Sequence, residues 1–224
     1  MLWVACVLIV LSLVSIGIYP VYGVSSNPST FLNGSSPYTV PYGDWITRWW
    51  QWNLQIPKEQ HPVVNASLTK CPVGESESVS FLSQKLQGKS QYSCTIPAGH
   101  AILLPIGTGE CTSDEADSVV PEAMIKCATE GDKYLTFDAS VDGIRLNGLD
   151  QNYAISKIFN MTVPKDNFLD LKPGQWNTAT GGYFIFLKPL PEGDHKISIN
   201  ARVTNPVDPS YNFNYDTLYL LKVQ

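Results

Sequence analysis

The chain carries few charged side chains, and positive charge is the scarcer kind. Only 16% of its 224 residues are charged, with 15 Lys and Arg against 20 Asp and Glu. An average soluble domain has roughly 25%. No run or stripe of basic residues occurs in the sequence. Because nucleic-acid binding needs basic side chains that neutralise phosphates, the composition excludes a nucleic-acid partner.

Recognisable catalytic and metal-binding motifs are also absent. The sequence contains neither the nucleophile motif G-x-S-x-G nor a C-x-x-C pair. Its three histidines, His61, His100 and His195, are too widely spaced to share one face of a helix or strand. We therefore expect no cofactor, and a histidine-ligated metal only if the fold brings distant residues such as His61 and His100 together.

Acidic residues form two further candidate groups. The first lacks the D-x-[DN]-x-[DN]-G order and would bind calcium only if a loop gathered it; its members are Glu110, Asp114, Glu115 and Asp117. The second could supply an acid and a base; its members are Asp138, Asp142 and Asp150. We interpret residues 114–117 as a solvated loop and Asp142 as part of an Asp-Gly turn.

The first 23 residues contain no charged side chain at all. Residues 2–19 suit the apolar core of a signal peptide, Pro20 breaks the helix, and Val21-Tyr22-Gly23 resembles an export cleavage site. We predict a signal peptide over residues 1–23. The segment has no basic start, so an uncleaved membrane anchor is the alternative, and only then would the protein contact a membrane. Residues 24–40, rich in Ser, Asn, Gly and Pro, are predicted to be a linker.

Four of the five cysteines follow this segment: Cys71, Cys94, Cys111 and Cys127. An even number outside the cytosol indicates disulfides, for which three pairings are possible. Chain order favours Cys71–Cys94 and Cys111–Cys127, because each bond closes a local loop. Three N-glycosylation sequons, at Asn33, Asn65 and Asn160, are compatible with export.

The strongest local pattern is a tryptophan-rich helix over residues 41–56, for which Asp44 is the expected N-cap. One helix face carries Trp45, Trp49, Trp52 and Ile56, and a second apolar edge carries Ile46, Trp50 and Leu54. A stripe this wide predicts burial on more than one side. Trp50 lies off the main stripe beside Arg48 and Gln51, so Trp50 and Arg48 are candidate ligand-binding residues.

Most of the remaining chain is predicted to be strand. The expected strands cover residues 79–82, 92–96, 101–106, 134–141, 153–163, 182–187, 196–203 and 217–223, with one short helix at 121–128. This pattern predicts a mainly β protein, in which residues 41–224 form one β-sandwich domain. The last ninety residues suggest an immunoglobulin-like, Greek-key arrangement.

Three segments carry a resemblance to a known family. They are YGDWITRWWQWNLQIPKEQHP, CTIPAGHAILLPI and LKPLPEGDHKISI. Together they resemble a family of uncharacterised exported proteins of bacteria and archaea, which share a Trp-rich helix (YGxWxxxWWQW) and a late L-P-x-G-x-H-x-I hairpin. The resemblance implies export and this fold, and it implies no activity.

The sequence therefore predicts an exported, disulfide-stabilised β-sandwich protein that works outside the cytoplasm. The expected role is a non-catalytic binding module whose partner is a protein, a glycan or a component of the cell envelope. The alternative is a secreted enzyme or a His-ligated metalloprotein that uses His61 and His100. The candidate binding residues are Arg48, Trp50, His61 and His100.

Overall fold

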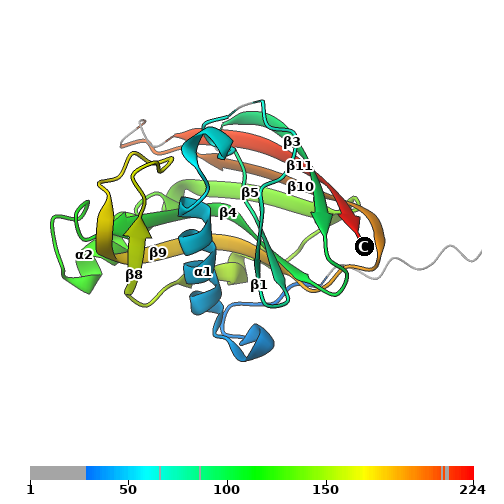
Figure 1. The fold of residues 1–224 in the computed structure, drawn as a ribbon, viewed down its shortest axis with the longest axis horizontal. Helices are drawn as coiled ribbons and strands as arrows, with labels where there is room; N and C mark the ends of the chain where they lie inside the picture. Colours follow the sequence, from blue (N-terminus) through cyan, green and yellow to red (C-terminus); the bar gives the residue numbers. More distant parts are fainter. Residues whose placement is uncertain (1–28, 66, 86, 208, 210–211) are drawn as a thin grey trace, which may run out of the picture.

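The computed structural model describes residues 29–65, 67–85, 87–207, 209 and 212–224. The predicted signal peptide lies outside these residues. The described part contains eleven strands in two sheets and two α-helices. Figure 1 shows the two sheets stacked as layers, with helix α1 across the outer face of one of them. The predicted mainly β, sandwich-like architecture is confirmed.

The first sheet has the order β1-β2-β4-β9-β7, with β8 also paired to β9. Its strands are β1 (Val73–Ser76), β2 (Val79–Leu82), β4 (Ala101–Thr112), β7 (Tyr153–Ile155), β8 (Phe159–Val163) and β9 (Gly174–Leu187). All pairs are antiparallel except β2 with β4.

The second sheet has the order β3-β11-β10-β5-β6. Its strands are β3 (Gly88–Ile96), β5 (Leu135–Val141), β6 (Ile144–Arg145), β10 (Gly193–Val203) and β11 (Phe213–Val223). The C-terminal strand β11 lies inside the sheet, antiparallel to β10 and parallel to β3. The helices are α1 (Tyr42–Leu54) and α2 (Pro121–Thr129), with 3₁₀ turns at Pro37–Thr39, Lys58–Gln60, Asp132–Tyr134 and Leu149–Asn152.

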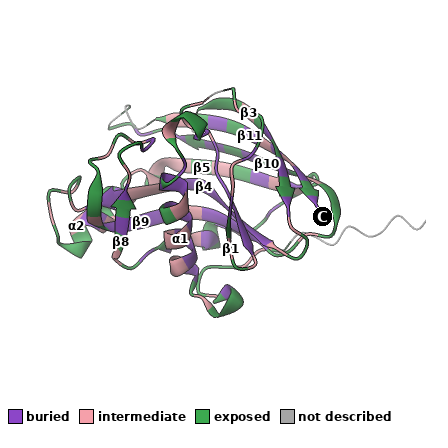
Figure 2. Ribbon diagram, in the orientation of Figure 1, coloured by how far each residue is buried: buried purple, intermediate pink, exposed green. Residues whose placement is uncertain are grey.

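Strands β4 and β9 are buried on both faces, which gives the protein two cores. In β4, Ile102 and Leu104 face the core between the sheets, whereas Ala101 and Leu103 face the core under α1. Phe184 and Phe186 of β9 also lie under α1. Side chains alternate between the faces of a strand, so burial on both sides explains the unbroken apolar run of the sequence here. The run is coloured as buried in Figure 2.

Helix α1 covers its sheet with tryptophans, three of which (Trp45, Trp49 and Trp50) donate their ring N–H groups to acceptors in the protein. Trp45 and Trp49 are buried, and they donate to the Pro37 carbonyl (3.0 Å) and the Leu82 carbonyl (2.8 Å). Burying large aromatic surfaces while satisfying each N–H is the most favourable use of tryptophan in a core. The predicted burial of Trp45 and Trp49 is confirmed.

Three expectations around this helix are wrong in detail. Asp44 lies in the first turn rather than at the N-cap, because the helix starts after Pro41, whose fixed φ suits this position. Trp52 is only half-buried, since its ring covers Gly74 at the outer edge of the sheet. Residues 29–40 of the predicted linker are bound to the domain, because Thr30 pairs with Leu187 and Phe31 packs on the core under α1.

The predicted strand at 153–163 is two strands, β7 and β8, which both pair with β9. The break follows β7 at Ser156, whose hydroxyl oxygen accepts the N–H of Thr180 in place of a backbone carbonyl. Strands β4 and β9 each run well beyond their predicted limits, so the acidic residue Glu110 lies in a strand. The short strands β1 and β6 were not predicted.

Both predicted disulfide pairings are confirmed. The Cys71–Cys94 bond holds residues 69–71 along the edge of β3, where the backbone of Ser93 also pairs with residues 69 and 71. The Cys111–Cys127 bond attaches α2 to β4. Two disulfides fit an oxidising, extracellular location. No helix in the described ranges has both the length and the apolar character needed to cross a membrane.

Replacing Trp49 by Ala should lower the free energy of unfolding by about 3–5 kcal/mol, because a large buried side chain and one hydrogen bond are lost. That is a large part of a typical domain's 5–15 kcal/mol. Denaturant unfolding measures it, and Val119→Ala, at a 73% exposed position, is the control with an expected change near zero. Unchanged stability of Trp49→Ala would show that α1 does not hold the outer core.

Candidate functional site

A cleft opens at the end of the first sheet where β4 and β9 change character. β4 carries large side chains up to Ile106 and then continues as Gly107-Thr108-Gly109. The antiparallel strand β9 carries large side chains from Tyr183 onward, and its preceding residues Gly181 and Gly182 lie opposite Gly109 and Thr108. The register shifts by a bulge between Pro105 and Gly107. Bulges re-aim side chains and often lie beside functional sites.

The cleft consists of two adjoining hollows that share Gly107, Thr108, Gly109, Glu110 and Phe213. The aromatic hollow measures about 230 Å³ and lies against α1. The acidic hollow measures about 310 Å³ and lies against the end of α2. Sites for small molecules are typically concave and largely apolar, with a few converging polar groups.

The aromatic hollow is walled by Trp49, Trp50, Phe168 and Phe213. Trp50, which the sequence suggested as a ligand-binding residue, is buried, with an exposed fraction of 5%. Its ring N–H donates to the Thr108 hydroxyl (3.2 Å), which in turn donates to the Gly181 carbonyl (2.7 Å). Trp50 therefore reaches the cleft as a fixed wall and not as an exposed surface residue.

His61 also lines the aromatic hollow, and it is completely buried. Its Nδ1 accepts the N–H of Val63 (3.2 Å), so the ring proton is on Nε2 and is donated to Asn53 Oδ1 (3.2 Å). The ring stacks on Phe168 with 3.6 Å between centroids. Burial lowers the pKa of His61 to about 3, so the ring is neutral. Both nitrogens are used within the protein, which makes His61 a structural residue of the wall.

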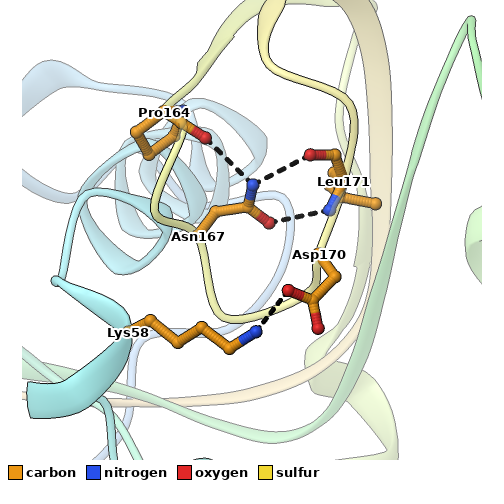
Figure 3. A network of polar contacts seen from close by, with 5 residues as sticks. All are labelled: Lys58, Pro164, Asn167, Asp170 and Leu171. Carbon is orange, nitrogen blue, oxygen red and sulfur yellow. Dashed lines mark hydrogen bonds and ion pairs between the residues drawn. The ribbon is translucent and has the colours of Figure 1, made fainter.

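The loop between β8 and β9 forms the outer wall and is fixed by a polar network (Figure 3). Asn167 is buried, and its side chain donates to the carbonyls of Pro164 (2.9 Å) and Leu171 (3.0 Å) and accepts the Leu171 N–H (2.9 Å). Asp170 forms an ion pair with Lys58, which lies shortly before His61. These bonds hold Phe168 over the hollow, so the site is formed in advance of binding.

Glu110 lies at the junction of the two hollows. The residue is half-buried, but its Oε2 atom is fully buried and has no hydrogen-bond partner. Burial raises the pKa of Glu110 to about 8, helped by the charge of Glu115 and by a hydrogen bond to it. The Oε2 atom of Glu115 accepts both the N–H (2.9 Å) and the hydroxyl (2.8 Å) of Thr112.

Asp132 lies in the acidic hollow with a similar environment. Its Oδ2 is buried without a partner. Burial raises the pKa of Asp132 to about 6, although a hydrogen bond from Tyr153 acts in the opposite direction. Among the described residues, the remaining unpartnered buried side-chain atoms belong to Asn152. Sequence reasoning missed Asp132, and it considered Glu110 only as a member of an acidic group that would bind calcium if a loop gathered it.

Two predicted binding residues lie elsewhere. Arg48 is on the exposed part of α1, where its guanidinium covers the Trp45 ring (4.6 Å) and pairs with Glu77 (3.2 Å). His100 precedes β4 and contacts the Ser80 hydroxyl (3.2 Å). It is separated from Gly107 by seven residues of strand, or roughly 20 Å, so His61 and His100 do not converge.

The other predicted acidic groups have structural partners. Asp138 pairs with Arg145 (2.5 Å), and Asp142 accepts from His195 (2.7 Å) and from the Lys196 N–H (2.8 Å). Asp142 also has a positive φ of 52° in the predicted Asp-Gly turn. Asp114 pairs with Lys172 (3.0 Å). Within the described ranges, no three His, Cys, Asp or Glu side chains lie close enough together to hold a metal ion.

The three sequons differ in accessibility. Asn160 is exposed on β8. The Asn33 side-chain nitrogen, to which a glycan would be attached, donates to the Tyr153 carbonyl (2.6 Å), and that of Asn65 donates to the Glu59 carbonyl (3.0 Å). Asn160 is therefore the sequon that the folded domain leaves most available.

The cleft depends on the close approach of α2 to β4, which Gly109 allows. A Cβ at this position would lie 2.3 Å from the Ala128 carbonyl oxygen. Gly109→Ala should therefore displace α2, lower the melting temperature by several degrees and shift the NMR signals of the acidic hollow. Gly131→Ala is the control, because a Cβ there has no heavy atom within 4 Å. Equal melting temperatures for the two variants would contradict this packing.

His61 should remain neutral across the physiological range. We expect its ring signals in NMR to stay constant from pH 8 down to pH 5, since burial disfavours the imidazolium form. His195 is the internal control: burial lowers its pKa, but the hydrogen bond to Asp142 outweighs this effect, so its pKa is raised above 6.5. Titration of His61 near 6.5 would show that the ring is accessible to solvent.

Comparisons with known proteins leave the chain without a family. No family model matches it, and no curated protein matches it. Its fold has weak similarity to a cysteine protease inhibitor, EhICP2, from Entamoeba histolytica, at 9% identity and a TM-score of 0.23, covering 62% of this chain and 88% of that one. The solution structure of Amebosin is similarly weak in its match, at 11% identity and a TM-score of 0.21, covering 62% of this chain and 98% of that one. Similarities this low carry no argument about function.

Proposed function

We propose that this protein is an exported, non-catalytic binding module whose ligand-binding site is the cleft beside β4. The partner is a small molecule, or the end of a glycan, protein or other envelope component that can enter the cleft. The observation that carries this proposal is the cleft itself: it is preformed and partly aromatic, and its lining includes Glu110 and Asp132, each of which has a buried carboxyl oxygen without a partner.

The rigidity of the walls supports a binding role. Trp50, His61 and Asn167 are all fixed by hydrogen bonds within the protein. Because these side chains are already ordered in the free protein, a ligand would lose little conformational entropy from them on binding, which favours affinity. Among the described residues that line the cleft, the buried side-chain atoms without a hydrogen-bond partner are the carboxyl oxygens of Glu110 and Asp132. An unpaired buried polar atom costs free energy until a partner arrives.

Working outside the cytoplasm is the second part of the proposal. It is supported by the two disulfides and by the uncharged residues 1–23, which match an export signal. An oxidising compartment preserves the Cys111–Cys127 bond, which fixes α2 and with it one side of the cleft.

One observation favours a secreted enzyme as the second candidate function. Glu110 and Asp132 have raised pKa values in one cleft, about 8 and about 6, and perturbed carboxyl groups are characteristic of acid–base catalysis. A time course by mass spectrometry on each compound that binds would distinguish the two functions. A binding module returns every compound unchanged.

The proposal is tested by a ligand-observed NMR screen of small molecules and short glycans on the full exported protein. Compounds that bind the cleft should lose at least tenfold in affinity with Phe213→Ala, which removes the wall shared by both hollows, and with Trp50→Phe, which removes the bond to Thr108. Val119→Ala is the control and should leave the affinity unchanged, because Val119 is exposed and does not line the cleft. If no compound responds to the cleft variants, the cleft is not the binding site.

A further inference from the structure

Building on this proposed function, we propose that the group bound in the cleft is an organic cation, a primary ammonium that donates hydrogen bonds to Glu110 and Asp132 and packs against the aromatic wall. The inference rests on three features of the cleft: the sign of its charge, its unpartnered acceptors and its aromatic lining.

The described residues that line the cleft carry acidic groups and no basic one. Glu110, Glu130 and Asp132 are among the lining residues, whereas none is a lysine or arginine. Lys133, which follows Asp132 in the sequence, lies over the Tyr134 ring (4.8 Å). An anion would therefore meet only negative charge, while a cation would neutralise it.

The unpartnered carboxyl oxygens are hydrogen-bond acceptors, so a ligand that satisfies them must supply hydrogen-bond donors. Glu110 Oε2 and Asp132 Oδ2 are both buried without a hydrogen bond. A primary ammonium has three N–H donors and can donate to more than one carboxylate. Glu110 and Asp132 both line the acidic hollow. Buried carboxylates are stable when paired with a cation and hydrogen-bonded, and this ligand supplies both conditions.

The aromatic hollow suits the carbon side of such a ligand and its charge. Trp49, Trp50, Phe168 and Phe213 surround the space that opens toward Glu110. Aromatic faces attract cations and accept apolar carbon equally well. An alkyl or aryl ammonium compound would thus place its carbon skeleton among the rings and its ammonium at the carboxylates.

Binding of a cation should release a proton. At pH 7 a group with a pKa of about 8 is about nine-tenths protonated, and a cation favours its ionised form. The titratable groups that face Glu110 are Glu115 after β4, Glu130 at the end of α2 and Asp132, while His61 is neutral and Tyr153 has a pKa of about 12. Burial raises the pKa values of the Glu110 and Asp132 carboxyls into the range between pH 5 and 9.

The test is isothermal titration calorimetry of the full exported protein with isosteric probe pairs. The pairs are 2-phenylethylamine with 2-phenylethanol, and 1,4-diaminobutane with 1,4-butanediol. We expect the amines to bind and the alcohols to bind at least tenfold more weakly. Amine affinity should rise about tenfold from pH 7 to pH 9 as Glu110 ionises, and titration in buffers of different ionisation enthalpy should show release of about one proton at pH 7.

Glu110→Gln should fold with unchanged or higher stability, because it removes a buried ionisable group that has no cation. It should nevertheless reduce amine affinity at least tenfold and abolish the proton release. Asp132→Asn, which keeps an acceptor for Tyr153, should also reduce affinity. Glu122→Gln is the matched control, since Glu122 is an exposed residue of α2 outside the cleft, and it should bind as the unmodified protein does.

The two proposals fail in different ways. If the alcohols bind as tightly as the amines, and Phe213→Ala weakens both, then the cleft binds ligands but the cation assignment is overturned. If the amines bind equally well to Glu110→Gln and to the unmodified protein, the carboxylates are not their receptors. If none of the four probes binds, the cation assignment also fails, and the broader NMR screen alone decides the proposed function.

Discussion

The antiparallel pairing of β4 with β9 is the interaction on which the rest of this structure depends. These are the two longest strands, and they are buried on both faces, so each contributes side chains to both cores at once. One face meets the second sheet and the other meets α1. A strand pair shared by two cores couples the stability of the sandwich to the docking of the tryptophan helix.

The cleft exists because this pairing changes composition along its length. From Ala101 to Ile106 and from Tyr183 to Leu187 the strands fill their surroundings with large side chains. Beyond Ile106 they present Gly and Thr, at residues 107–109 of β4 and 180–182 of β9, and these small residues leave space while the backbone pairing continues to Thr112. The helix α2, fixed by Cys111–Cys127, closes the far side. A single ladder thus builds a packed core at one end and a cavity at the other.

Local pattern was enough to predict the helix, the two disulfides and the sandwich class. The spacing of Trp45 and Trp49, four residues apart on one face of a helix, identified the buried face, and chain order identified the cysteine pairs. Trp50 was misjudged because its cover comes from β4 and from the loop at 164–172, which lie far away in sequence. The predicted strand ended at residue 106, before Glu110, because Gly107-Thr108-Gly109 interrupts the apolar pattern, although pairing with β9 keeps that segment in the sheet. Asp132 gave no sequence signal, since only the fold buries its carboxyl.

The proposed binding site depends on Glu110, which lies at the junction of the two hollows and whose buried Oε2 has no hydrogen-bond partner among the described residues. The most direct measurement is the pKa of Glu110, obtained from the pH dependence of its side-chain carboxyl ¹³C signal in the ligand-free protein. We expect a value of about 8, because burial and the neighbouring Glu115 both oppose the ionisation of Glu110. A value near the ordinary 4.5 would contradict it, since Glu110 would then be solvated or already paired.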